Sequence, residues 1–281
     1  MPAIPAYFQT AMSPAIKCPS SSKDNDNAAN TQTQILPIRK HKFSLPKLRL
    51  QLNDLSHEGS SGFLSKIKGN EDISTQVENV LNLLYTPDST RPGTRSVTLI
   101  LRPMNGVAYT TGSDLDEDHK EIHLNLNYIK RCDRDEILGV VCHELVHCFQ
   151  WNAENSCPGG LVEGFADWVR LRAGLGAKHW KQDAEGKWDA GYQHTGYFLE
   201  YLEQRFGEGT VRHMNECLRK GKWDQQRVFG ECCDGRDVKD LWEEYGRDLK
   251  EKRVTAGVSA TSDAETAIPT HGVANDQSKA V

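Results

Sequence analysis

The order of apolar and polar residues predicts strands followed by helices in the middle of the chain. Residues 71–85 carry apolar side chains at helical spacing, which predicts a helix. Residues 96–103 and 105–112 then read as two strands, of which the first is β-branched and ends at a proline. Strict alternation follows in residues 120–129, where one side carries Ile122, Leu124 and Leu126 and the other carries His123, Asn125 and Asn127. This alternation predicts a half-buried strand, placed at an edge of the sheet by its polar side.

Helical signals replace strand signals from Asp133 onward. Asp133 can cap a helix because Glu136 follows three residues later, and the apolar residues behind it extend the helix to about Trp151. A Cys-Pro-Gly-Gly break separates it from a second helix at 161–174, and a third is predicted at 190–206. Two more helices are expected, the last ending near residue 252. Strands first and helices afterwards indicate an α+β fold with a small N-terminal mixed sheet and a helical C-terminal part.

Both ends of the chain differ in composition from its middle. Residues 1–40 and 254–281 are rich in small and polar residues and contain few large apolar ones. Such segments bury too little surface to offset the entropy of ordering, so we expect them to be disordered. The sequence therefore predicts one domain over residues 41–253.

Charge and apolar content narrow the classes of function. The formal net charge is -5, which argues against a nucleic-acid or anionic-membrane binder, and no apolar run is long enough to span a bilayer. The first residues lack the basic start and uninterrupted apolar stretch of a signal peptide, so a cytoplasmic protein is expected. The 8 cysteines form no Cys-x-x-Cys pair and are expected to be reduced thiols.

The stretch HELVH, residues 143–147, carries the candidate chemistry. His143 and His147 are four residues apart and so project from one face of the predicted helix, where their imidazoles can bind one zinc ion. Glu144 can reach a metal-bound water without being a ligand. The alternative is a helix whose polar groups are satisfied by neighbours. The helix is otherwise apolar, however, and burying these three polar side chains without a metal ion or other partners would cost several kcal/mol in unsatisfied polar groups.

A catalytic zinc needs a third protein ligand, and the next predicted helix offers two carboxylates. Glu163 and Asp167 are four residues apart on one face, and an antiparallel return of the chain would bring Glu163 to the metal. Asp167 would then accept the N–H of a ligating histidine. Spacing alone leaves the reverse assignment open, with Asp167 as the third ligand. The alternative that Glu163 and Asp167 are exposed to solvent is weaker, because the residues around them in the predicted helix are apolar.

These motifs together resemble the plant basic secretory protein family, also called peptidases of plants and bacteria, within the glutamate-zincin-like metallopeptidases. The matching stretches are residues 106–110, 121–129, 143–151, 158–170 and 188–199, and the resemblance extends from about Leu45 to Leu249. It implies a zincin-like fold, one zinc ion per chain held by His143, His147 and Glu163, and a peptide or protein substrate. Plant members carry a secretion signal, so the resemblance implies secretion as the alternative to a cytoplasmic location.

The resemblance and the residues agree on zinc-assisted hydrolysis of a peptide bond in which Glu144 is the general base. No device that binds a free amino terminus is evident, which favours an endopeptidase, but the sequence leaves endo- and exopeptidase action open. Tyr192 and His194 are candidates to stabilise the oxyanion; Tyr192 is preferred because it falls on a tyrosine that recurs in the family, although it could equally be a packed tyrosine. A peptide substrate could add to the strand 121–127. The expected protein is a monomer that binds neither nucleic acid nor membranes. The alternatives are a zinc-stabilised, non-catalytic peptide-binding protein, which would not need Glu144, and a zinc-free defence protein.

Overall fold

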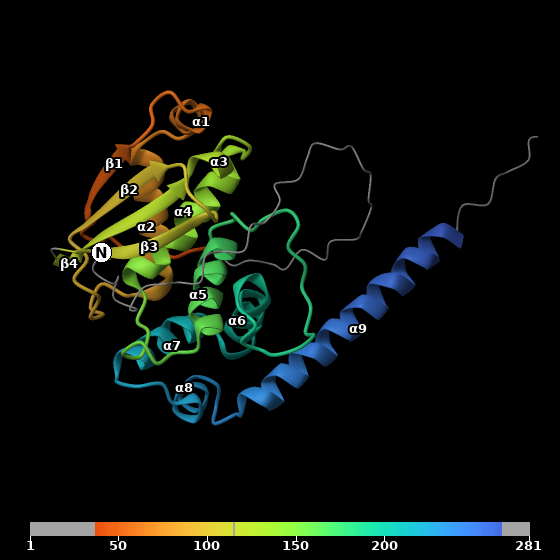
Figure 1. Ribbon diagram of the computed structural model, residues 1–281. Helices are drawn as coiled ribbons and strands as arrows, with labels where there is room; N and C mark the ends of the chain where they lie inside the picture. The colour runs from red at the N-terminus through yellow and green to blue at the C-terminus, as the bar shows by residue number, and fades with distance from the viewer. Residues whose placement is uncertain (1–36, 115, 266–281) are drawn as a thin grey trace, which may run out of the picture.

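A four-stranded mixed sheet forms one side of the molecule (Figure 1). The computed structural model describes residues 37–114 and 116–265, with side chains as far as residue 255. The strand order is β1-β2-β4-β3, where β1 (Lys47–Leu52), β2 (Ser96–Arg102) and β4 (Asp116–Asn125) run parallel. β3 (Ala108–Ser113) pairs antiparallel with β4. The predicted combination of a mixed sheet with helices is therefore confirmed.

Helices cover one face of this sheet and enclose the main core. α4 (Arg134–Phe149) contacts β3 and β4, and α2 (Asn70–Leu84) packs against α4 and β1. The core-facing residues of β2 and β4, such as Leu101 and Ile122, are fully buried beneath them. α1 (Glu58–Lys66) lies beside the short α3 (Leu126–Ile129). The sequence pattern made no prediction for β1 or α1.

The helix that carries the histidines begins where the sequence predicts it. The Asp133 side chain accepts a hydrogen bond from the backbone N–H of Glu136 and so caps α4. Every residue from Ile137 to Phe149 is buried, because α4 is covered by the sheet on one side and by α5 (Gly159–Arg172) on another. The polar groups of α4 within this span therefore need partners inside the protein.

A second group of helices follows α4 and packs below the sheet as viewed in Figure 1. It contains α5, α6 (Tyr192–Phe206), α7 (Thr210–Arg219) and α8 (Gln225–Cys232). α5 and α6 share the most extensive helix-helix contact in the described residues. α9 (Val238–Glu265) starts in this layer and extends away from the rest of the molecule.

The structure corrects the prediction that the strand at 121–127 lies at an edge. β4 lies between β2 and β3, and the edge beside it is β3. The strand also ends at Asn125, whose side chain accepts the backbone N–H of Asn127 and starts α3. The alternating polar residues do not mark an exposed side of a half-buried strand either, because His123 and Asn125 are both buried. Thr110 on β3 meets α4, whereas the neighbouring Tyr109 stacks on His123 at the opposite face.

The helical part differs from the prediction in number and length. Within the described residues, α7, α8 and α9 follow α6, where two helices were expected. α7 and α8 have only 10 and 8 residues, so the periodic pattern does not separate them. α9 continues to Glu265, so residues 254–265 are helical although the C-terminal tail was predicted from 254. The rest of both predicted tails, residues 1–36 and 266–281, lies outside the described residues.

Candidate metal centre

The antiparallel packing of α4 and α5 brings two imidazoles and a carboxylate together. The Nε2 atoms of His143 and His147 are 3.2 Å apart. Glu163 places one oxygen 3.1 Å from His143 Nε2 and the other 3.8 Å from His147 Nε2. All three residues are buried, and their donor atoms lie within 4.8 Å of one another. These are the three residues that the family resemblance implies as metal ligands.

The donor set fits a zinc ion in both chemistry and spacing. Nitrogen and oxygen ligands at zinc distances of about 2.0–2.1 Å stand about 3.4 Å apart in a tetrahedron. The observed separations of 3.1, 3.2 and 3.8 Å bracket that value. Two histidines and one glutamate leave one position of a tetrahedral zinc open. The group therefore has the composition of a catalytic site.

Asp167 lies behind His143. Its carboxylate accepts a hydrogen bond of 2.7 Å from His143 Nδ1, one helical turn from Glu163. This bond holds a proton on Nδ1, so Nε2, which points at His147 and Glu163, is the ring nitrogen that a metal ion would bind once its own proton is displaced. Asp167 thus contacts His143 at Nδ1, while Glu163 contacts the same ring at Nε2.

Gln150 orients the other imidazole. Its side-chain amide contacts His147 Nδ1 at 3.0 Å, and its buried oxygen Oε1 has no partner. Turning the amide over would place Oε1 against an Nδ1–H of His147 and give that oxygen a partner. The Nε2 lone pair would then be available to a metal. The sequence pattern alone did not single out Gln150, although it stands three residues after His147.

Charge at this site favours a bound cation. Burial by itself lowers the pKa of His143, but Asp167 and Glu163 outweigh burial and raise the pKa to about 10. Burial lowers the pKa of His147 to about 4, against the opposing charge of Glu163. The pKa of Glu163 lies below its ordinary value: burial raises it, but the hydrogen bond from His143 and the charges on both histidines lower it further. The two carboxylates thus stabilise positive charge between the helices.

Glu144 is buried beside this group but is not part of it. Its carboxylate oxygen Oε2 accepts a 2.7 Å hydrogen bond from the Thr110 hydroxyl on β3. Burial raises the pKa of Glu144 to about 7, against the smaller effects of the His143 charge and the Thr110 bond. Thr110 was quoted in the sequence only as part of a motif, and its link to Glu144 depends on the position of β3 over α4.

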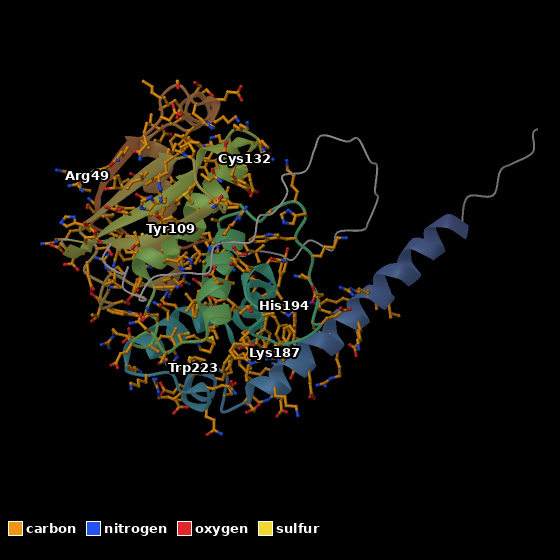
Figure 2. The ribbon with its side chains drawn as sticks, viewed as in Figure 1. Arg49, Tyr109, Cys132, Lys187, His194 and Trp223 are labelled. Atoms are coloured by element: carbon orange, nitrogen blue, oxygen red, sulfur yellow. The ribbon has the colours of Figure 1, made fainter. Side chains whose placement is uncertain are left out.

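The two candidates for oxyanion stabilisation lie in different surroundings. The Tyr192 ring stacks on His143, with centroids 6.1 Å apart and planes at 13°. His194 instead contacts Asp183 at 3.0 Å and the Lys187 carbonyl at 3.1 Å, and its ring meets Trp242. Figure 2 shows His194 and Lys187 in the region where α9 begins. Of the two, the structure brings Tyr192 to the histidine pair and places His194 elsewhere.

Glycines on α5 allow α6 to approach the site. A Cβ on Gly164 would lie 2.3 Å from Thr195 Cγ2, and a Cβ on Gly160 would lie 1.7 Å from the Asp189 carbonyl oxygen. No larger residue fits at either position without movement of the backbone or of Thr195. Where α6 begins, Gly191 and Tyr192 have φ angles of 96° and 49°, a left-handed turn that points the tyrosine toward His143. These small residues place Tyr192 next to the metal ligands.

A comparison with models of protein families identifies the family of this chain. The model described as "Peptidase of plants and bacteria" matches residues 45–245. The matched range covers more than half of the chain and contains every residue of the metal centre. The chain belongs to this family. No curated protein and no solved structure gave a match.

The family of peptidases of plants and bacteria is the one that the sequence motifs indicate, so that prediction is confirmed. Its description supports peptidase activity in general. In this member, α4, α5 and the start of α6 all lie inside the matched range. No helix in the described part of the chain has both the length and the apolar character to cross a membrane.

Proposed function

We propose that this family member is a zinc-dependent endopeptidase with a zincin-like arrangement of sheet and helices. The observation that carries the proposal is the buried group of His143, His147 and Glu163 with a further carboxylate, Glu144, beside it. Zinc bound by the three ligands would acidify water and polarise the carbonyl of a peptide bond. A purely structural metal site would have no use for a buried base at Glu144.

Glu144 is suited to move the proton in this reaction. Its carboxylate would accept the proton of the attacking water and deliver it to the leaving amine. The Thr110 hydroxyl occupies Oε2 and fixes the carboxylate orientation, which leaves the second oxygen for the water. Because the water donates its proton to Glu144 as it attacks, an amide at this position would bind water but could not act as a base.

Tyr192 is suited to stabilise the oxyanion that forms on the substrate. Its ring lies against His143, and the turn at Gly191 holds it there. A tyrosine hydroxyl can donate a hydrogen bond to the developing negative charge. We assign this role to Tyr192 rather than His194, whose ring is held by Asp183, Lys187 and Trp242.

β3 is suited to hold an extended substrate. It is one of the two outer strands of the sheet, and within the described residues its outer edge pairs with no other strand. An added peptide strand would gain main-chain hydrogen bonds there. Thr110 joins the same strand to Glu144, so a peptide on β3 would lie close to the base. The role first considered for the strand at 121–127 thus passes to β3.

The experiment that tests the proposal is Glu144→Gln. The amide is nearly isosteric, so zinc content should stay at one ion in the His143, His147, Glu163 site while peptide cleavage falls by about 10²–10⁴-fold. Asp135→Asn, an exposed carboxylate on the same helix, is the matched control and should retain full cleavage. His143→Ala should lose both this zinc and cleavage. Metal analysis and hydrolysis of a mixed peptide library provide the readouts.

A different outcome would favour the alternative function. If wild type and Glu144→Gln bind peptides equally and neither cleaves any library member at pH values from about 5 to 9, the chain is a zinc-stabilised binding protein. If wild type purified without chelator and supplied with zinc contains none in this site, the mechanism is wrong.

A further inference from the structure

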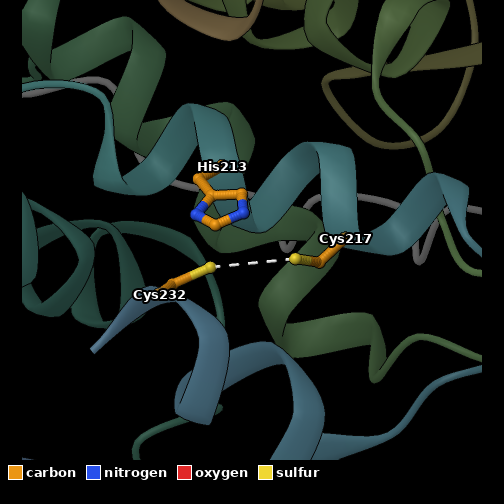
Figure 3. A group of neighbouring side chains, drawn as sticks. All are labelled: His213, Cys217 and Cys232. Atoms are coloured by element: carbon orange, nitrogen blue, oxygen red, sulfur yellow. Dashed lines mark hydrogen bonds between the residues drawn. The ribbon is translucent and has the colours of Figure 1, made fainter. Parts of the chain in front are cut away.

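A second cluster of metal-binding side chains lies between α7 and α8. His213 and Cys217 stand one turn apart on α7, and Cys232 ends α8. One donor atom of each lies within 4.8 Å of the others. Figure 3 shows the imidazole and the two thiols gathered between the two helices. No residue of this cluster takes part in the proposed peptidase mechanism.

The distance between the two sulfur atoms is close to that between two thiolate ligands of one zinc ion. Their separation is 3.9 Å. Two thiolates on one tetrahedral zinc, each at about 2.3 Å, stand about 3.8 Å apart. Cys217 and Cys232 are buried, whereas His213 is exposed. An ion can therefore enter from the solvent side at His213 and be held against the buried thiols.

A carboxylate lies beside one of the two thiols. Glu231 Oε2 lies 3.3 Å from Cys217 Sγ, and Lys220 Nζ lies 3.4 Å from the same carboxylate. The Glu231 side chain is exposed, so it can turn toward an ion held by the other three residues and supply the fourth ligand that a closed structural zinc site requires. A metal ion binds the thiolate forms of the two cysteines.

We propose that His213, Cys217, Cys232 and Glu231 form a second, structural zinc site that joins α7 to α8. Two thiolates and an imidazole prefer zinc to the hard cations magnesium and calcium. Binding releases the two thiol protons to solvent and forms two zinc–sulfur bonds, with no change in oxidation state. The site is independent of the catalytic one, because it shares no ligand with His143, His147 and Glu163.

Fixing α8 in this way supports the segment that leads to Tyr192. Phe229 on α8 meets the Trp188 ring at a centroid distance of 5.2 Å. The Trp188 carbonyl in turn accepts a 2.8 Å hydrogen bond from the Thr195 hydroxyl on α6. A zinc ion bound at Cys232 would therefore fix α8, which contacts Trp188, and Trp188 in turn contacts the start of α6.

Cobalt substitution tests the site without using peptidase activity. Only thiolate ligands give cobalt(II) an intense sulfur-to-metal absorption band, and the catalytic group contains no thiolate. Reduced, metal-free full-length protein titrated with Co²⁺ should show this band, and Zn²⁺ should abolish it. The band should weaken in Cys217→Ser and in Cys232→Ser, each of which keeps one thiolate, and it should be lost in the double variant. Cys157→Ala, a partly buried thiol outside the cluster, is the matched control and should keep it.

His213→Ala keeps the test decisive if the cysteine variants fail to fold, because His213 is exposed. It should weaken zinc binding at this site by at least about 10–100-fold. The His143→Ala, His147→Ala double variant should still bind one zinc and show the cobalt band, whatever the outcome for the peptidase. Absence of the band in reduced wild-type protein, or its survival in a folded Cys217→Ser, Cys232→Ser double variant, would overturn the proposal.

Discussion

Individual contacts at the metal centre distinguish the two carboxylates of α5. Glu163 faces the Nε2 atoms of both histidines, whereas Asp167 contacts His143 only through Nδ1. A ring nitrogen that donates its proton to a carboxylate cannot also bind a metal through that atom. The geometry therefore favours Glu163 as the ligand and Asp167 as the group that orients His143.

Substitution of each carboxylate tests this assignment. Glu163→Ala should abolish tight zinc binding at the catalytic site, because it removes one of three protein ligands. Asp167→Asn can still accept the His143 proton but lacks the charge, so we expect zinc affinity or activity to fall by about 10–100-fold. Zinc competition against a chelator measures both. Loss of zinc in Asp167→Ala together with its retention in Glu163→Ala would reverse the assignment.

At the scale of elements, the close approach of α5 and α6 shapes the site. Gly164 directly follows Glu163, the proposed third ligand, and Thr195 of α6 fills the space where a side chain would stand. Thr195 also donates to the Trp188 carbonyl and accepts the Gly191 N–H, so it fixes the turn before Tyr192. The helix that carries the ligand and the turn that carries the tyrosine are thus tied together through one threonine.

Gly164→Ala should disturb this contact. The added Cβ would stand 2.3 Å from Thr195 Cγ2. We expect a loss of about 1–3 kcal/mol in the free energy of unfolding, typical of overpacking, together with reduced cleavage as Tyr192 moves. Thermal denaturation and peptide hydrolysis measure the two effects. Gly159→Ala on the same helix is the matched control, because its Cβ would meet nothing within 4 Å. Equal behaviour of the two variants would contradict the prediction.

At the scale of the molecule, the core and the candidate metal centre occupy one continuous part of the chain. The buried apolar cluster extends from Phe63 to Leu249, and it surrounds the α4–α5 pair. Beyond residue 253 the described side chains make few contacts; Thr255, for example, bonds only within α9. We propose that residues 41–253 form the domain.

A shortened protein tests this boundary. Residues 41–253 expressed alone should fold and bind zinc at His143, His147 and Glu163, because every partner of these residues lies inside the range. Its Tm should stay within about 4 °C of the full chain, which corresponds to roughly 1 kcal/mol for a domain of this size. Calorimetry and metal analysis measure the two properties. An unfolded or zinc-free product would show that the excluded residues belong to the domain.

Local patterns in the sequence determined much of this protein. The cap at Asp133, the apolar α4 and the i, i+4 spacing of His143 and His147 each depend on residues close in the chain, so they could be predicted without a structure. The same holds for the spacing of Glu163 and Asp167 and for the motifs that identify the family. Helical periodicity is a local property, which is why the helix with the histidines was predicted almost to its last residue.

Only the tertiary structure decided how distant segments meet. Strand order depends on hydrogen bonds between segments far apart in sequence, so alternation at β4 could not reveal that β3 is the edge. The contacts of Thr110 with Glu144 and of Tyr192 with His143 likewise join residues 34 and 49 positions apart. The meeting of His213 and Cys217 with Cys232 requires α8 to fold back on α7. Packing in three dimensions, which no local pattern encodes, selects these partners.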